Sequence, residues 1–246
     1  MTTQYYAHRA FGAHEVPPGH VERPGRYDAV DAALAAEPFA TLDRRDAPRA
    51  DPAAIERVHP SAYRAFIEEN APADAAQPTL ARFDPDTYMG PSSLEAAQRG
   101  AGAAAAAAKA VWEGEADNAF VAARPPGHHA EPGKAMGFCF FNNAAIAAME
   151  ARSLGAARVA AVDFDVHHGN GVEAAFWSDE HAFYASSHEF PQYPGTGRAD
   201  DRGEFDNIAN APLSSGSGGT AFRRAWGEIL LPAMSDFDPD FIVISA

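Results

Sequence analysis

An apolar run passes directly into a polar one in the stretch Val159-Ala-Ala-Val-Asp163-Phe-Asp165-Val-His167-His168-Gly-Asn170-Gly171. Four consecutive apolar residues are typical of a short buried strand. If the extended backbone continues past Val162, Asp163, Asp165 and His167 share one face, because alternate side chains of a strand point the same way. Charged groups at the end of a buried strand need partners or a cation. The stretch therefore predicts a metal site, the alternative being a plain Asx-type turn that ends the strand.

Other apolar runs of strand length alternate with helical segments along the rest of the chain. The expected strands are residues 119–123, 159–162, 182–186 and 241–245, and the expected helices between and beyond them are residues 142–154, 171–177 and 220–235. Strands that alternate with helices predict an α/β fold, with a largely parallel sheet covered by helices on both faces.

The first ninety residues are rich in proline, alanine and charge, and predict an irregular entry region with short helices such as residues 60–69. A long Ala-rich helix is expected over residues 92–112, because alanine has the highest helix propensity. Ser92 and Glu95 have the spacing of a capping box at its start.

Composition limits the class of protein. At 246 residues, 46% of them hydrophobic, the chain is long enough for one large domain over residues 1–246. No apolar run approaches the roughly 20 residues that span a bilayer, and the first residues lack a signal-peptide pattern, so a cytoplasmic protein without membrane contact is expected. The lone Cys139 predicts a small buried residue rather than a nucleophile.

The net charge of −15 argues against direct nucleic-acid binding, which needs Lys and Arg to replace phosphate counterions. The same charge suits a cationic substrate, and it equally serves solubility alone.

Polar clusters follow three of the expected strands. Arg124-Pro-Pro-Gly-His128-His129 comes after the first, the Asp/His stretch after the second, and Ser187-His188-Glu189 after the third. Ligands of open parallel sheets gather at the carboxyl ends of the strands, so the three loops are expected to form one site. A stiff Pro/Gly loop can deliver two imidazoles to that site; the alternative is a surface loop with two solvated histidines.

Five motifs, in order along the chain, resemble the histone deacetylase superfamily, which includes bacterial deacetylase-like amidohydrolases, acetylpolyamine amidohydrolases and acetoin-utilisation proteins. They are Gly19-His20-Val-Glu22-Arg23-Pro24-Gly-Arg26, Arg124-Pro-Pro-Gly-His-His-Ala130, Met136-Gly-Phe-Cys-Phe-Phe-Asn-Asn143, Asp163-Phe-Asp-Val-His-His-Gly-Asn-Gly171 and Tyr193-Pro-Gly-Thr-Gly197. The resemblance implies an arginase-like α/β fold that carries a zinc hydrolase site.

Residue by residue, the resemblance makes Asp165 and His167 two of three protein ligands to Zn²⁺, with Fe²⁺ as the alternative metal. Asp163 would orient His128, and Asn170 would pair with His129. A carboxylate favours a charged imidazole and an amide does not, so the two histidines can differ in pKa and role. His129 would be the general base, and His128 an electrostatic helper.

Further positions are implied by the same resemblance. Gly137, Phe138 and Tyr193 would line a narrow substrate channel, Asp86 its rim, and Arg26 an internal cavity for the released acid. For Phe138 a core aromatic, and for Asp86 a turn residue, remain alternatives. K⁺ is a secondary expectation near Asp163, Asp165, His167 and Ser186. His168 has no assigned role.

The implied substrate is an acylated amine, either an acetyl-lysine protein or peptide or an acetylpolyamine, and a homo-oligomer is left open. The family's third ligand Asp and its oxyanion Tyr would follow Phe241-Ile-Val-Ile-Ser-Ala246, so the domain is expected to be C-terminally incomplete and weakly active or inactive. Alternatives are a non-catalytic remnant that binds acylated or cationic partners and, with lower weight, an arginase-like or other two-metal hydrolase.

Overall fold

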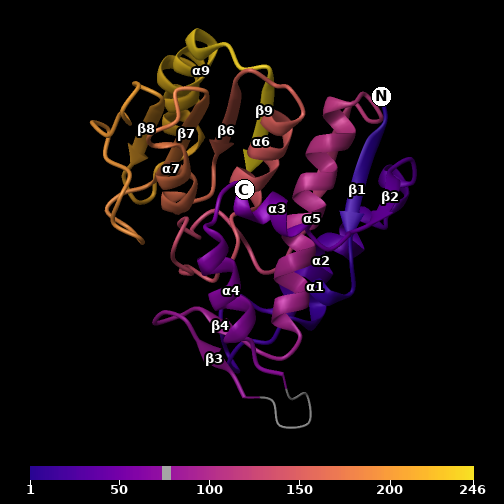
Figure 1. Ribbon diagram of the computed structural model, residues 1–246. Coiled ribbons are helices and arrows are strands. Elements are labelled where there is room, and N and C mark those ends of the chain that lie inside the picture. The colour runs from indigo at the N-terminus through magenta and orange to yellow at the C-terminus, as the bar shows by residue number, and fades with distance from the viewer. Residues whose placement is uncertain (74–78) are drawn as a thin grey trace.

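The computed structural model describes residues 1–73 and 79–246. A four-stranded parallel sheet carries the stretch quoted above, in the order β8-β7-β6-β9 (Figure 1). Its strands are β6 (Val159–Asp163), β7 (Ala182–Glu189), β8 (Ile208–Leu213) and β9 (Phe241–Ser245). Asp163 lies in register with Ser186 of β7 and Ser245 of β9. The carboxyl ends of three strands therefore meet at one edge of the sheet.

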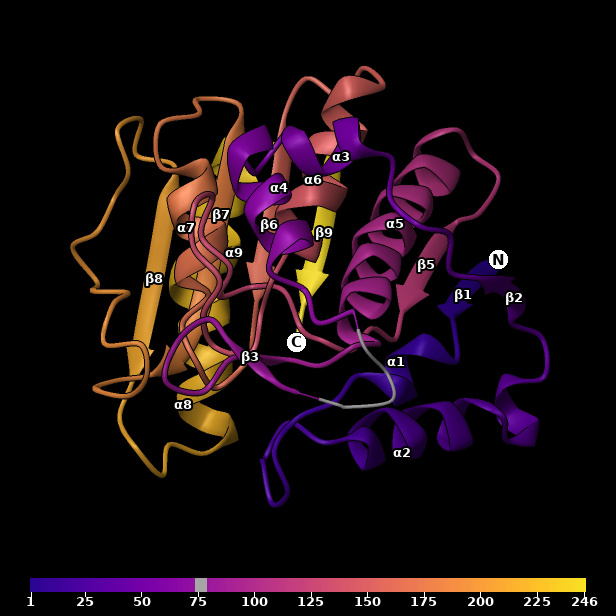
Figure 2. The same ribbon diagram turned by 60° about the horizontal axis from the view of Figure 1, so that its bottom comes forward.

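Strand β6 is apolar at every position before Asp163 because both faces of the sheet are covered. Val159 and Ala161 pack with residues of α6 (Asn143–Ser153) and α7 (Asn170–Phe176). Ala160 and Val162 pack on the other face, against α8 (Gly219–Ala225), a π-helical turn (Trp226–Leu230) and α9 (Leu231–Phe237). The two groups of helices lie on opposite sides of the sheet (Figure 2). The predicted α/β class, with a parallel sheet between helices, is confirmed.

The expected strand at residues 119–123 belongs to a second parallel sheet of order β2-β1-β5, which pairs β2 (Asp43–Asp46), β1 (Thr3–Ala7) and β5 (Asn118–Val121). A two-stranded antiparallel pair is formed by β3 (Ala81–Arg82) and β4 (Tyr88–Met89). The entry region thus contributes strands where the sequence predicted only loops and short helices.

The remaining helices of the described residues are α1 (Ala10–Ala13), α2 (Pro24–Leu34), a 3₁₀ turn (Glu37–Phe39), α3 (Pro52–Glu56), α4 (Ser61–Glu69) and α5 (Ser93–Trp112). The predicted helices at 60–69, 92–112, 142–154 and 171–177 agree within about one residue. The helix predicted at 220–235 is interrupted by the π-helical turn next to Pro232, whose missing N–H cannot complete the regular ladder. None of the helices in the described ranges is long and apolar enough to cross a membrane.

The capping box predicted at Ser92 and Glu95 is wrong. Ser92 has helical dihedral angles and makes no capping hydrogen bond, and the Glu95 carboxylate pairs with Arg99 and Arg49. The Ser93 hydroxyl accepts a hydrogen bond at 2.8 Å from the N–H of Gly90, which precedes the helix. Cys139 is fully buried, as predicted.

Candidate active site

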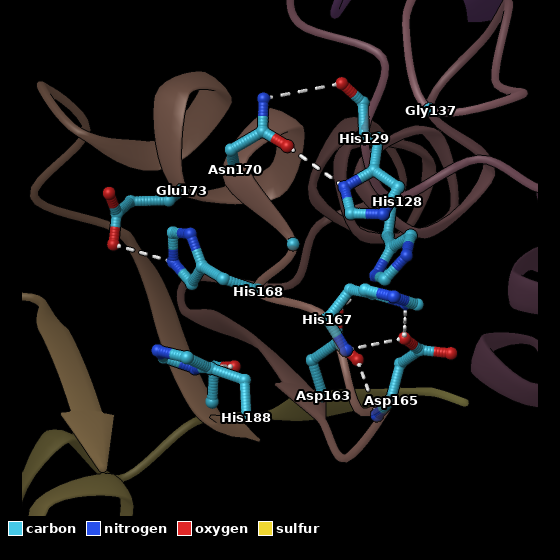
Figure 3. A network of polar contacts seen from close by, with 12 residues as sticks. His128, His129, Gly137, Asp163, Asp165, His167, His168, Asn170, Glu173 and His188 are labelled. Atoms are coloured by element: carbon cyan, nitrogen blue, oxygen red, sulfur yellow. Dashed lines mark hydrogen bonds and ion pairs between the residues drawn. The ribbon is translucent and has the colours of Figure 1, made fainter. Parts of the chain in front are cut away.

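The loop after β5 brings two adjacent histidines to the end of β6. The ring centroids of His128 and His129 lie 4.0 Å apart (Figure 3). Gly171 N–H donates to the His128 carbonyl at 3.0 Å, which fastens the histidine loop to the start of α7. The predicted convergence of this loop and the 163–171 stretch is present in the fold.

His128 faces Asp163. Its Nδ1–H donates to Asp163 Oδ2 at 2.8 Å, and both side chains are buried. Burial opposes the charged imidazole, but the neighbouring Asp163 carboxylate outweighs it and raises the pKa of His128. Burial likewise works against the charged carboxylate, yet His128 and nearby donors lower the pKa of Asp163. The pair therefore favours a charged His128.

His129 faces an amide instead of a carboxylate. Its Nδ1–H donates to Asn170 Oδ1 at 2.9 Å. Burial, followed by the charge on His128, lowers the pKa of His129 to about 3. Two neighbouring imidazoles thus differ in charge because their Nδ1 partners and surroundings differ, and His129 is the neutral one.

Asp165 and His167 lie on a bent segment rather than on an extension of the strand. Strand β6 ends at Asp163, whose Oδ1 accepts from Asp165 N–H at 3.1 Å, and Asp165 Oδ1 accepts from His167 N–H at 2.7 Å. The prediction that extended geometry continues to His167 is wrong, because these two side-chain contacts turn the backbone. The turn still brings His167 Nδ1 within 3.1 Å of Asp165 Oδ1. Phe164 and Val166 of the same segment are exposed.

The donors on this segment fit a zinc ion in kind, since zinc binds imidazole nitrogen and carboxylate oxygen. Asp165 supplies a carboxylate and His167 an imidazole. The His167 side chain is 39% exposed and that of Asp165 29%, so both are open to a ligand. Among residues 1–73 and 79–246 no group of three or more His, Cys, Asp or Glu side chains is placed to hold a metal ion. Asp165 and His167 are therefore two donors of the kinds that zinc binds.

Two of the predicted channel residues, Gly137 and Tyr193, lie next to His129. A Cβ on Gly137, where φ is +57°, would lie 2.5 Å from His129 Cδ2, so glycine is required for this close approach. The ring of Tyr193 lies 5.1 Å from His129 and 6.1 Å from His167 between centroids. Phe138 is half-buried with a φ of +70°, and its N–H donates to Thr87 Oγ1 at 2.9 Å.

The remaining predicted positions are more dispersed. Asp86 is half-buried, and its backbone carbonyl accepts from His20 Nε2–H at 3.1 Å. Ser186 is buried beside Asp163 in the ladder, where its hydroxyl donates to His188 Nδ1 at 2.9 Å. Arg26 is exposed on α2, so the expectation that it lines an internal cavity is not met. The buried arginine among the five motifs is Arg124, whose Nε lies 2.6 Å from Glu22 Oε1.

Several polar neighbours of the site escaped sequence reasoning. The Tyr184 hydroxyl accepts from Gly169 N–H at 3.0 Å and lies 3.4 Å from Asp163 Oδ2. A Cβ on Gly169 would lie 2.4 Å from the same carboxylate oxygen. The signal for Gly169 was its place inside the motif, whereas Tyr184 stands in an apolar strand with nothing to mark it.

His168, which had no assigned role, is buried in a polar network behind the site (Figure 3). Its Nε2–H donates to Glu173 Oε2 at 3.0 Å, and its Nδ1 accepts from the Thr196 hydroxyl at 2.8 Å. Asn210 Nδ2 donates to the same Glu173 oxygen at 2.6 Å. His168 therefore links α7 to the 193–197 loop that carries Tyr193.

Known proteins share both the sequence and the architecture. A family model for the histone deacetylase domain matches residues 20–246. The histone deacetylase-like amidohydrolase of Pseudomonas aeruginosa is 40% identical over 237 residues, which cover 93% of this chain and 60% of that protein. The chain thus spans less than two thirds of this relative.

Two solved structures resemble the whole chain. The HD domain of HDA15 superimposes with a TM-score of 0.92 at 35% identity, covering 100% of this chain and 72% of that one. The acetylpolyamine aminohydrolase of Burkholderia pseudomallei gives a TM-score of 0.85 at 30% identity, covering 100% of this chain and 82% of that one. With the family match and the paired histidines, these similarities establish that the chain belongs to the histone deacetylase family of hydrolases.

Proposed function

We propose that this chain carries the site of a deacetylase that hydrolyses the amide bond of acylated amines. The observation that supports it is the unequal pairing of two adjacent imidazoles. His128 donates to a buried carboxylate and His129 to an amide oxygen. A charged and a neutral imidazole side by side are suited to stabilising negative charge and to accepting a proton, respectively.

In this proposal His129 is the general base. Because its Nδ1–H is donated to Asn170, its Nε2 carries the free lone pair and can take a proton from an attacking water. The same nitrogen can then return the proton to the leaving amine. His128 stays charged beside Asp163 and stabilises the negative charge that develops on the acyl oxygen.

Asp165 and His167 would hold a metal ion, Zn²⁺ or alternatively Fe²⁺. When bound, such an ion supplies Lewis-acid polarisation of the acyl carbonyl and a lower pKa for its water. Gly137 leaves room for the His129 ring, and the Tyr193 ring lies beside the rings of His129 and His167. As a second ion we propose K⁺ near Asp163, Asp165, His167 and Ser186.

The substrate class we propose is an acetylated amine with a cationic or peptide remainder. The names of the relatives, a histone deacetylase-like amidohydrolase and an acetylpolyamine aminohydrolase, support this class. Asp86 is the candidate contact for the amine portion, because it is half-buried and one of its carboxylate oxygens, Oδ1, has no hydrogen-bond partner among the described residues.

The test is hydrolysis of N-acetylputrescine, an acetyl-lysine peptide and a longer-chain acyl-lysine peptide by the purified chain, with zinc added and bound zinc measured. We expect zinc-dependent release of the free amine that His129→Ala abolishes. The same assay tests the sequence-based expectation that the chain is weakly active or inactive, which near-stoichiometric zinc with rapid turnover would contradict. Absence of hydrolysis together with retained binding of acetylated ligands would refute the enzymatic proposal.

A further inference from the structure

The amide of Asn170 has a second partner besides His129. While its Oδ1 accepts from His129 Nδ1–H, its Nδ2 donates to Glu131 Oε1 at 2.9 Å. Two longer contacts at 3.4 Å join the same Nδ2 to the His129 carbonyl and to Met136 Sδ. Asn170 is 5% exposed, so its amide depends mainly on protein groups for its hydrogen bonds. Glu131 is therefore the shortest contact of the amide nitrogen.

The two ends of an amide differ in chemistry but hardly in shape, so hydrogen-bond partners decide which way it points. An ionised carboxylate only accepts hydrogen bonds. Glu131 thus requires the NH₂ end of Asn170 to face it, which turns Oδ1 toward His129. A reversed amide would set two oxygens against each other and present an N–H to His129 Nδ1.

The direction of the amide in turn selects the tautomer of His129. An oxygen opposite Nδ1 requires the Nδ1–H tautomer and leaves Nε2 unprotonated, whereas an N–H opposite Nδ1 would favour the tautomer protonated on Nε2. Only the first can accept a proton at Nε2. We infer that Glu131 is a positioning residue that acts through Asn170 to hold His129 in the tautomer with a free Nε2.

The fold holds Glu131 in place for this role. Its backbone is paired with Lys134, with N–H to carbonyl distances of 3.0 and 3.2 Å. Glu131 lines, with Asn170 and Glu173, a pocket of about 400 Å³ that opens on the surface. A substitution at residue 131 therefore changes a pocket wall rather than the packed core, and the fold is expected to tolerate it. The effect on catalysis rests on the proposed function, but the tautomer of His129 does not.

The direct test reads the tautomer in the metal-free protein labelled with ¹⁵N-histidine. Long-range ¹H–¹⁵N spectra distinguish the two neutral tautomers, and the signals that disappear in His129→Gln assign the ring. We expect the Nδ1–H tautomer in the unsubstituted chain and a mixture in Glu131→Ala. Glu131→Gln, which retains an acceptor, should largely restore the first tautomer. Ser178→Ala, on the same pocket wall, is the matched control and should leave it unchanged.

Kinetics of the zinc-loaded protein give a second reading. Glu131→Ala should lower kcat roughly 10- to 100-fold, as loss of an outer partner of a site residue does, with KM unchanged. Glu131→Gln should recover most of that loss. An unchanged His129 tautomer in Glu131→Ala would overturn the inference, and Glu131→Met provides the same comparison if the alanine variant does not fold. If the unsubstituted chain hydrolyses nothing, the proposed function fails while the tautomer result still decides the role of Glu131.

Discussion

The His128 imidazole donates a hydrogen bond of 2.8 Å to the Asp163 carboxylate, and neither side chain is more than 10% exposed. Each group favours the charged form of the other against the cost of burial, as the raised pKa of His128 and the lowered pKa of Asp163 indicate. In a buried pair of this kind, the cost of burying each charge is offset only while both partners are present.

Asp163→Asn should therefore destabilise the fold substantially. The substitution leaves His128 buried without a counter-charge and also weakens the acceptor for Asp165 N–H. We expect the free energy of unfolding, measured by urea denaturation, to fall by about 3–5 kcal/mol. Asp200→Asn, at an exposed position, is the control and should change it by less than about 0.5 kcal/mol. Equal effects of the two substitutions would contradict the pairing.

Gly137→Ala should impair catalysis through His129. The added methyl group would lie 2.5 Å from His129 Cδ2, and the positive φ of Gly137 disfavours alanine in addition. Displacement of a reacting group by about 1 Å can cost roughly 10²-fold in rate, so a loss of that order in kcat is expected in the hydrolysis assay.

The same loop offers a matched control for that measurement. A Cβ on Gly133 would meet no atom within 4 Å, and its φ is not positive. Gly133→Ala should keep both kcat and stability. Normal turnover by Gly137→Ala would show that the His129 ring is not held by this contact.

The parts of the fold that could be predicted from sequence are those whose burial is continuous along the chain. Strand β6 is covered on both faces, so its apolar run is unbroken and easily recognised. Strand β2 has the sequence Asp-Arg-Arg-Asp and is mostly exposed, and β8 includes Asn210 and Pro212. These two strands form through pairing with β1 and β7, which are distant in sequence, and no local pattern marks them.

The site divides in a similar way. The pairing of His128 with Asp163 and of His129 with Asn170 was expected from the resemblance to the histone deacetylase superfamily, and both contacts are present. The bend after Asp163 corresponds to the Asx-type turn that the sequence offered only as the alternative, because it depends on side-chain contacts with backbone N–H groups two residues ahead. Contacts such as that of Glu131 with Asn170 require two loops to meet in a particular register, which periodicity does not encode.

His59 should make stability depend on pH, away from the metal-binding segment. It is fully buried, its Nδ1–H donates to the Pro132 carbonyl at 3.0 Å, and its Nε2 accepts from Asn142 N–H at 2.9 Å. Burial lowers its pKa from 6.5 to about 4. Below pH 6.5 the unfolded chain therefore takes up a proton that the folded chain does not.

The stabilisation from neutral His59 is complete above pH 6.5 and is lost as the pH falls toward 4, by up to roughly 3 kcal/mol. Urea denaturation across this range should give a shallower pH dependence for His59→Gln than for the unsubstituted chain. His181→Gln, which replaces an exposed histidine, is the matched control. Parallel curves for His59→Gln and the unsubstituted chain would refute this contribution.

His168 should fasten the loop that carries Tyr193. Its ring joins Thr196 of that loop to Glu173 of α7, and Gly197 packs so closely on it that a Cβ there would lie 2.6 Å from His168 Cδ2. In His168→Phe an aromatic ring still fills the site, but both hydrogen bonds are lost, which leaves buried polar groups unpaired. We expect the free energy of unfolding to fall by about 1–3 kcal/mol, and amide hydrogens of residues 195–197 to exchange faster.

His181→Phe, at an exposed position, should change neither the stability nor the exchange. Unchanged exchange in the loop of a destabilised His168→Phe would mean that His168 supports α7 alone, and that the position of Tyr193 is fixed by other contacts.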